Sequence, residues 1–397
     1  MNEALLKEAA DLSAARVAAA AFRGWITNVA LPLWGAEGFD KRLGLFDERF
    51  DFDGRPIRDV PRRVMTQARQ IYVFSQAAEL GWSADGGRLA EAAMASLVRL
   101  YGADGSLANG VAFSVGADGA VASAVRDSYA HAFVLFALAA LHRLNGDPRL
   151  LAHADDVARF VDASLTDETY GGLYDRFPVD DRAKRQNPLM HLLEACLALE
   201  EAAPGRGFLE RAKKIVDLFR ARLFAADPGV LLEHFAQDWS PHPDPAKAGI
   251  FEPGHHFEWV WLLSQYERLS GEGVFPFILQ LHQSALRRGV AADGLIVDEI
   301  DRDMRVAKPS HRVWPHAEAV KAAAAMADRG DAGAPRFAAD MIGALTSTFL
   351  GRPFAGGWID HVSADGEPIV AFAPSSTLYH LAFAAVEASK AFEPKSA

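Results

Sequence analysis

The segments between predicted helices alternate in length, short then long, along the whole chain. Hydrophobic periodicity with Pro, Gly and Asp punctuation predicts twelve helices, at about 3–29, 61–81, 85–101, 126–145, 148–164, 187–203, 206–223, 254–270, 273–289, 312–328, 333–349 and 374–390. Each even-numbered helix of this series is joined to the next by a short turn, such as Asn145-Gly146-Asp147. Each odd-numbered helix is followed by a long segment: 30–60, 102–125, 165–186, 224–253, 290–311 and 350–373. The chain therefore repeats a helical hairpin roughly every 55 to 65 residues.

Six such hairpins can stack as an open solenoid or close into a ring of six inner and six outer helices. The even-numbered helices are the more apolar around their circumference, as inner helices should be. An open solenoid would need a polar cap, but the last helix is apolar at Leu378, Leu381, Phe383 and Val386. We therefore expect an all-α, (α/α)6 barrel of twelve helices, forming a single domain over residues 1–397.

The long segments contain Gly-rich turns flanked by strand-like residues, for example at 50–54, 171–175 and 356–360. These patterns predict short β-hairpins in the long loops. The alternation of loop lengths places all six long loops, and the N-terminal ends of all six inner helices, on one face of the barrel. We look for a site on that face.

Charge and composition exclude some classes of function. The chain has 52 acidic and 41 basic residues, for a formal charge of −11, so it lacks the basic field that nucleic acid binding needs. No apolar stretch reaches the roughly 20 residues that span a bilayer, and charged residues interrupt the first helix where a signal peptide would be apolar. A single cysteine, Cys196, lies in an apolar run, which predicts a buried thiol and a cytoplasmic protein.

Each even-numbered helix begins with polar or aromatic residues that its apolar pattern does not require. These are Arg63, Gln67 and Arg69; Arg126, Asp127, Tyr129 and His131; Asn187 and His191; Glu252, His255, His256, Glu258 and Trp259; Arg312, Trp314, His316 and Glu318; and Ser375, Ser376 and His380. One such start is ordinary helix capping. The coincidence of six points to a shared site.

Three histidines of this set are candidates for proton transfer. His255 and Glu258 are three residues apart on one helix face, so the carboxylate is expected to orient the imidazole, unless the two form a plain surface pair. His380 and His191 lie within apolar helices, where each either bonds a neighbouring backbone group or faces a cavity.

Other chemistries fit the sequence less well. His311 and His316 do not form the His-Glu-x-x-His zinc pattern, and we find no clustered third ligand, phosphate loop or Gly-x-Ser-x-Gly elbow, so we expect neither metal nor cofactor. The carboxylates Asp127, Glu252, Glu258, Glu318 and Asp360 leave a glycosidase open. The abundance of histidine favours proton shuttling.

The same stretches resemble the N-acylglucosamine 2-epimerase family, which contains mannose isomerases and cellobiose 2-epimerases. The matching segments are 63–69, 187–191, Pro253-Gly254-His255-His256-Phe257-Glu258-Trp259, Arg312-Val313-Trp314-Pro315-His316-Ala317-Glu318 and the late His380. The resemblance implies an (α/α)6 barrel that acts on sugars without a metal, with His255 and His380 as the acid/base pair. Ala130 stands where the family pattern leads us to expect an acidic residue.

The implied chemistry is removal of the C2 proton of an open-chain aldose to give a cis-enediolate. A proton returned to C1 gives the ketose, and one returned to the opposite face of C2 gives the epimer. Arg69 is expected to stabilise the oxyanion and Trp314 to pack on the sugar, with His191, Glu258, Glu318 and Tyr129 as further substrate contacts.

The resemblance favours an aldose–ketose isomerase of the D-mannose to D-fructose type. The alternatives are a 2-epimerase of an N-acylhexosamine or other sugar, a mannose-6-phosphate isomerase and, outside the class, a glycoside hydrolase or an inert sugar-binding barrel. The expected partner is a monosaccharide, and the protein a monomer or homodimer. Arg62, Arg63, Lys308 and Arg312 either hold a phosphate or neutralise acidic groups at the rim.

Overall fold

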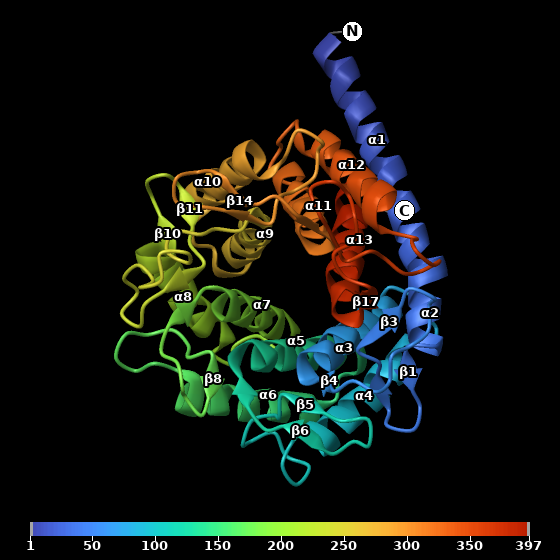
Figure 1. The fold of residues 1–397 in the computed structure, drawn as a ribbon, viewed down its shortest axis with the longest axis vertical. Coiled ribbons are helices and arrows are strands. Elements are labelled where there is room, and N and C mark those ends of the chain that lie inside the picture. The colour runs from blue at the N-terminus through green and yellow to red at the C-terminus, as the bar shows by residue number, and fades with distance from the viewer. Residues whose placement is uncertain (1–2, 395–397) are drawn as a thin grey trace.

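The computed structural model describes residues 3–394, and its helices form two concentric rings (Figure 1). The inner ring consists of α3 (Val64–Glu79), α5 (Ser128–Asn145), α7 (Asn187–Ala202), α9 (Pro253–Ser270), α11 (Val313–Ala327) and α13 (Leu378–Phe392). Each inner helix packs against the next, and α13 contacts α3 to close the ring. The expectation of an (α/α)6 barrel is confirmed.

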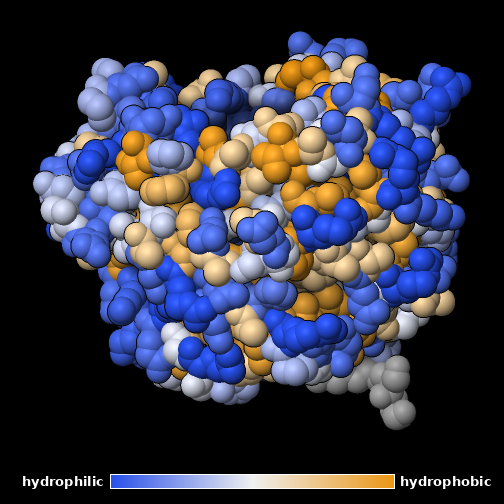
Figure 2. Space-filling view, turned by 90° about the horizontal axis from the view of Figure 1, so that it is seen from below, coloured by the Kyte–Doolittle hydropathy of each residue, from blue (hydrophilic) through white to orange (hydrophobic). Residues whose placement is uncertain are grey.

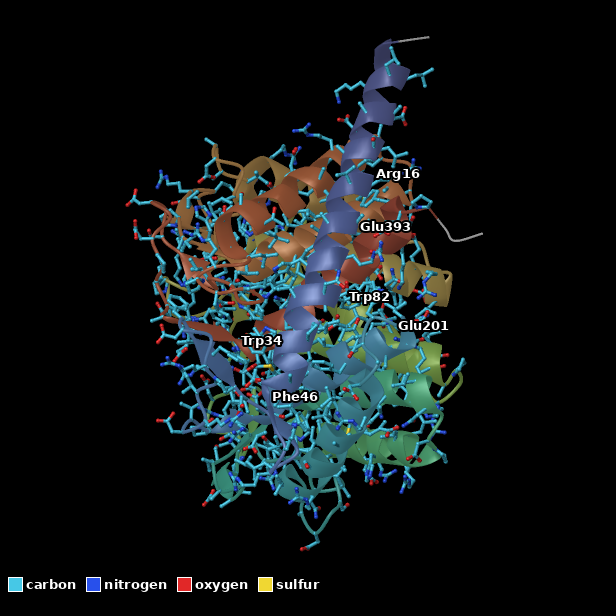
Figure 3. The ribbon with its side chains drawn as sticks, turned by 90° about the vertical axis from the view of Figure 1, so that its right-hand side faces the viewer. Arg16, Trp34, Phe46, Trp82, Glu201 and Glu393 are labelled. Atoms are coloured by element: carbon cyan, nitrogen blue, oxygen red, sulfur yellow. The ribbon has the colours of Figure 1, made fainter. Side chains whose placement is uncertain are left out.

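The outer ring consists of α1 (Glu3–Trp25), α4 (Gly86–Tyr101), α6 (Pro148–Phe160), α8 (Phe208–Leu218), α10 (Phe275–Ser284) and α12 (Ala334–Ala344). Five of these helices pack on the inner helix that precedes them, whereas α1 packs on α12 and α13. Figure 3 shows α1, which carries Arg16, crossing the outside of the barrel near Glu393. Arg16 Nε donates to the Phe392 carbonyl and Arg23 pairs with Glu393 at 2.8 Å, so α1 is held against the C-terminal end of α13.

The burial of each helix follows its sequence pattern. Inner α5 is buried around most of its circumference, whereas outer α8 buries one stripe, Phe208, Ala212, Ile215 and Val216. Seen from below, the outer surface is a mosaic of hydrophobic patches between hydrophilic residues (Figure 2). Within residues 3–394, no helix is both long and apolar enough to cross a membrane.

The predicted helix ranges include segments that differ from an α-helix. Five outer helices end in one π-helical turn: η1 (Ile26–Ala30), η2 (Val161–Leu165), η3 (Phe219–Leu223), η4 (Ala285–Gly289) and η5 (Leu345–Phe349). The predicted loop 30–60 begins with an additional short helix, α2 (Leu31–Ala36). Trp34 fixes α2, because its ring stacks on Trp358 at 4.8 Å and its Nε1 donates to the Gly356 carbonyl at 3.0 Å.

The long loops contain short antiparallel strands. Four pairs are local hairpins: β1 (Phe39–Asp40) with β2 (Leu45–Phe46), β5 (Ser114–Val115) with β6 (Val121–Ser123), β10 (Phe224–Ala225) with β11 (Val230–Leu231), and β13 (Glu299–Ile300) with β14 (Val306–Lys308). They confirm short hairpins in the long loops, but not at 50–54, 171–175 and 356–360, where isolated bridges close the turns. The other pairs join neighbouring loops: β4 (Arg62–Arg63) with β5, β7 (Arg126–Asp127) with β8 (Arg176–Phe177), β9 (Lys184–Arg185) with β12 (His234–Phe235), β15 (His311–Arg312) with β16 (His361–Val362), and β17 (Phe372–Pro374) with β3 (Arg49–Asp51).

These pairs between loops form a second ring above the helices. A bridge between Phe251 and Ile300 supplies the remaining link, so every long loop is tied to the next one. In each link, one partner lies directly before an inner helix, as β4 lies before α3 and β15 before α11. The starts of the inner helices are therefore fixed relative to one another at the barrel mouth.

Candidate active site

A cavity of about 250 Å³ lies where the six inner helices begin. It is lined by Arg69, Tyr129, Asn187, His191, Glu252, His255, Glu258, Arg312, Trp314, Asp360, Pro374, Ser376, Thr377 and His380. Every inner helix contributes at least one of these side chains. Seven of the eight predicted site residues line the cavity, and the eighth, Glu318, lies behind His380.

His255 is a protonated imidazole at neutral pH. Its Nδ1 lies 2.9 Å from Glu233 Oε1, and its Nε2 lies 3.3 Å from the side-chain amide of Asn187. Burial acts to lower the pKa of His255, but the charges of Glu233 and Glu252 outweigh burial and raise the pKa to about 9. The histidine is therefore a proton donor.

The prediction that Glu258 orients His255 is wrong. The partner is Glu233, which lies in the loop between β11 and β12 and is held by Gln186, whose amide donates to Glu233 Oε2 at 3.0 Å. Glu258 instead lies 3.7 Å from His191 Nδ1. Glu233 follows two leucines in a loop that has no helical period, so the sequence offered no signal for it.

His380 has the opposite protonation state. Its Nδ1 lies 2.6 Å from Glu318 Oε1, so Nδ1 carries the proton and Nε2 is left as an acceptor. Burial, aided by the positive charge of Arg69, lowers the pKa of His380 to about 4 against the opposing effect of Glu318. A neutral imidazole of this kind is a base.

Trp314 connects the two histidines. Its ring lies 4.9 Å from the ring of His255 and 5.7 Å from that of His380, measured between centroids. A Cβ on Gly254 would lie 2.6 Å from the Trp314 ring, so only glycine lets α9 approach this indole. The Pro-Gly-His sequence therefore serves to seat Trp314 beside His255.

Arg69 is a cation without a carboxylate partner among residues 3–394. Its guanidinium donates to the Tyr129 hydroxyl at 2.5 Å and to the Ser376 carbonyl at 3.2 Å, and lies 4.2 Å from the centre of the Phe133 ring. Its positive charge is therefore available to an anion in the cavity.

Burial favours the uncharged forms of two further groups of the site. Burial lowers the pKa of His191 to about 4, and its Nδ1 lies 3.1 Å from Glu194. Burial, together with the charge of Glu318, raises the pKa of Glu258 well above its usual value. Burial thus favours the protonated form of Glu258, which can donate a hydrogen bond.

Three histidines at the predicted helix starts bind loops and not the cavity. His131, His256 and His316 each accept a backbone N–H through Nε2 at 3.0 Å, from Val111, Leu231 and Ile296 respectively. Burial lowers the pKa of all three to about 4. They are structural links between an inner helix and the loop before it.

The four arginine and lysine candidates for phosphate binding are all paired with carboxylates. Arg62 lies 2.5 Å from Asp47, Arg63 pairs with Glu48, and Lys308 lies 2.5 Å from Glu299. Arg312 bridges Glu252 at 2.7 Å and Asp298 at 2.8 Å. These cations neutralise acidic groups of the rim.

The structure also brings together potential metal ligands, contrary to the expectation from sequence spacing. His191, Glu194 and Glu258; Glu233, Glu252 and His255; and Glu258, Glu318 and His380 each place their ligand atoms within 4.8 Å of one another. Two of these groups already contact a cation, because Arg312 binds Glu252 and Lys321 lies 2.8 Å from Glu318. The positive charge that a metal would bring is supplied there by side chains.

Comparison with known proteins shows similarity over most of the chain. The family model described as N-acylglucosamine 2-epimerase matches residues 44–384. A mannose-6-phosphate isomerase of Rhizobium meliloti (strain 1021) is 35% identical over 379 residues, covering 92% of this chain and 95% of the relative. A D-mannose isomerase of Pseudomonas cannabina pv. alisalensis is 29% identical over 225 residues, 51% of this chain and 54% of the relative. A cellobiose 2-epimerase structure from Spirochaeta thermophila DSM 6192 has a TM-score of 0.83 at 24% identity, covering 96% and 97% of the two chains.

Proposed function

Because the chain belongs to the N-acylglucosamine 2-epimerase family, whose members are sugar epimerases and isomerases, we propose that it interconverts an aldose and its ketose, of the D-mannose to D-fructose type. The whole chain would act as one catalytic domain in the cytoplasm, without metal or cofactor. The observation that carries the proposal is the pair of histidines in one cavity whose pKa values are displaced in opposite directions.

His380 is the proposed base. Its neutral imidazole removes the C2 proton of open-chain mannose, and Glu318 stabilises the imidazolium that forms. Arg69 and the protonated His255 stabilise the negative charge that develops on the enediolate oxygens.

His255 is the proposed acid. It delivers its proton to C1, a proton passes from the C2 oxygen to the C1 oxygen, and fructose results. Exchange with water then returns both histidines to their starting states, so the C1 position of fructose acquires a solvent proton. The Trp314 ring beside both histidines offers an apolar wall for the sugar carbons.

An unphosphorylated hexose fits the charges of the cavity best. Glu252 and Asp360 are among its lining residues, and Arg312, the second arginine there, is held by two carboxylates. A sugar phosphate would have to rely on Arg69, which the reaction needs for the oxyanion.

Two other reactions remain as candidates. The 35% identical relative is named a mannose-6-phosphate isomerase, which favours the phosphorylated substrate. A 2-epimerase would use the same histidines but return the proton to the opposite face of C2.

A sugar panel separates these reactions. The protein is dialysed against a chelator and incubated with mannose, mannose 6-phosphate, glucose, N-acetylglucosamine and cellobiose, and the products are resolved by chromatography. We expect fructose from mannose at full rate. Formation of fructose 6-phosphate from mannose 6-phosphate, without fructose from mannose, would show that the substrate is the phosphorylated sugar. Formation of a C2 epimer without a ketose would show that the enzyme is an epimerase. Activity that is lost on chelation and restored by a divalent ion would show that the histidines are ligands.

A further inference from the structure

A buried lysine lies beneath the candidate active site. Lys321, on α11, is fully buried, and its Nζ lies 2.8 Å from Glu318 Oε2. The ammonium also lies 4.6 Å from the centre of the Trp261 ring and 4.2 Å from that of Phe383. Burial acts to lower the pKa of Lys321, but Glu318, Glu194 and Glu258 outweigh burial and raise it. Lys321 is therefore a cation.

Charged and titratable groups face Lys321 from the surrounding inner helices. Glu318 on α11, Glu194 on α7 and Glu258 on α9 act on Lys321 directly. Glu194 in turn contacts His191 and Tyr379, Glu318 contacts His380, and Arg69 on α3 acts on His380. Neighbouring positive charges and hydrogen bonds keep Glu194 and Glu318 ionised, whereas burial raises the pKa of Glu258. The positive charges of Lys321 and Arg69 both act to lower the pKa of His380.

The position of Lys321 relative to His380 is specific. Glu318 uses Oε1 for His380 Nδ1 at 2.6 Å and Oε2 for Lys321 at 2.8 Å, so one carboxylate connects the lysine to the imidazole. Lys321 itself is absent from the cavity lining. It can therefore act on the reaction only through other residues.

We propose that Lys321 is a positioning residue, which holds Glu318 ionised and aligned so that His380 stays a neutral base with Nε2 free for the substrate. This inference rests on the proposed function, in which His380 removes the C2 proton. Without Lys321, the charge of Glu318 is compensated by no ammonium, so it favours the protonated form of His380 more strongly. A protonated His380 cannot accept a proton from the sugar.

The test is the acid side of the pH profile of kcat/KM for Lys321→Met. We expect activity to begin falling about one pH unit or more higher than in the wild type, because the proton affinity of His380 rises tenfold or more. At pH 5 we expect kcat to fall about twofold or more relative to the wild type while KM stays within about twofold, because Lys321 does not touch the sugar. Lys321→Arg, which keeps the charge, should restore the wild-type profile.

Lys184→Met is the matched control. Lys184 is also fully buried in an ion pair, 2.9 Å from Asp167, but belongs to β9 and does not line the cavity. Its loss should lower stability without moving the acid limb. The proposal would be overturned if the acid side of the kcat/KM profile were unchanged in folded Lys321→Met, or if it shifted equally in Lys184→Met. If Lys321→Met does not fold, Lys321→Gln carries the same test, since it keeps a hydrogen-bond donor for Glu318.

An NMR titration of the His380 ring separates this inference from the proposed function. The signal is assigned by its loss in His380→Asn. If wild-type protein converts none of the sugars, the proposed function fails, but a rise in the His380 pKa in Lys321→Met would still support the role of the lysine. An unchanged His380 titration would refute that role whatever the activity.

Discussion

His255 and His380 are the same residue type in one cavity, and their carboxylate partners alone do not explain their different protonation states. Each imidazole has a glutamate at Nδ1, Glu233 for His255 and Glu318 for His380. The difference is that Glu252 adds a second negative charge near His255, whereas Arg69 and Lys321 add positive charge near His380. The second neighbours therefore decide which histidine is acid and which is base.

The pH dependence of the wild-type enzyme follows from these two pKa values. The reaction needs neutral His380, with a pKa of about 4, and protonated His255, with a pKa of about 9. We expect kcat/KM to be flat from about pH 5 to pH 8 and to fall above pH 9. An acid limb near pH 6.5, the ordinary pKa of histidine, would contradict this assignment.

Removal of the Glu233 charge should move the alkaline limb. Glu233→Gln removes a negative charge that raises the pKa of His255, so His255 loses its proton at lower pH. We expect the limb to shift down by about one pH unit or more, measured as kcat/KM between pH 7 and pH 10. Glu299→Gln, at the rim in an ion pair with Lys308, is the control and should leave the limb in place.

At the scale of elements, the barrel mouth depends on links between loops and helix starts. His316 joins two segments, because its Nε2 accepts from Ile296 N–H at 3.0 Å and its Nδ1 donates to the Arg312 carbonyl at 2.8 Å. His131 makes the same two kinds of bond to Val111 and Asp127. These links repeat around the ring and fix the loops that cover the cavity.

Substitution of His316 should measure the strength of one link. His316→Phe keeps the buried ring but leaves the Ile296 N–H without an acceptor, so we expect a loss of about 1–3 kcal/mol in the free energy of unfolding by urea. His153→Phe, at a half-buried position on outer α6, should change stability by less than about 0.5 kcal/mol. Equal effects of the two substitutions would show that His316 is not a special link.

The sequence predicted the elements better than the contacts between them. Helical periodicity and Gly or Pro breaks are local signals, so the twelve helices were predicted, although the π-helical turns that end five of them and the short α2 were not. The pairing of β4 with β5 or of β17 with β3 joins residues far apart in the chain, whereas local sequence patterns predict only hairpins. Glu233 was missed for the same reason, because a loop residue acquires its role only when the neighbouring loop is in place.

At the scale of the whole molecule, closure of the ring explains why the site was predictable. Alternating loop lengths place six helix starts on one face. Closure then brings Arg69 and His380, from opposite ends of the sequence, into the same cavity, where Arg69 donates to the Ser376 carbonyl. The predicted role of Glu258 failed because spacing on one helix does not specify which carboxylate another segment brings nearer.

The buried histidines should make the whole fold sensitive to acid. His131, His191, His256, His316 and His380 have pKa values lowered by burial to about 4, so the unfolded chain binds protons more readily than the folded one below pH 6.5. Their stabilising effect is complete above pH 6.5 and is lost as the pH falls towards 4. We expect each of these histidines to lower the free energy of unfolding at pH 5 by on the order of 1 kcal/mol or more relative to pH 7.

Urea unfolding at pH 7 and pH 5 checks this expectation. His255 has a raised pKa and acts in the opposite sense, since its contribution is complete below pH 6.5 and is lost as the pH rises towards 9. Five histidines against one predict a net loss of several kcal/mol at pH 5. Equal stability at the two pH values would show that the buried histidines are not neutral in the folded protein.

The central claim is that His380 removes the C2 proton of the sugar and His255 delivers a proton to C1. It is tested most directly by NMR of the mannose C2 proton in deuterium oxide. Wild-type protein should form fructose with deuterium at C1. His255→Asn should exchange the C2 proton for deuterium without forming fructose, and His380→Asn should do neither, because asparagine keeps polarity but cannot exchange a proton near neutral pH. Near-normal fructose formation by both variants would contradict the account and would move the search for the acid and base to Glu258 and Glu318.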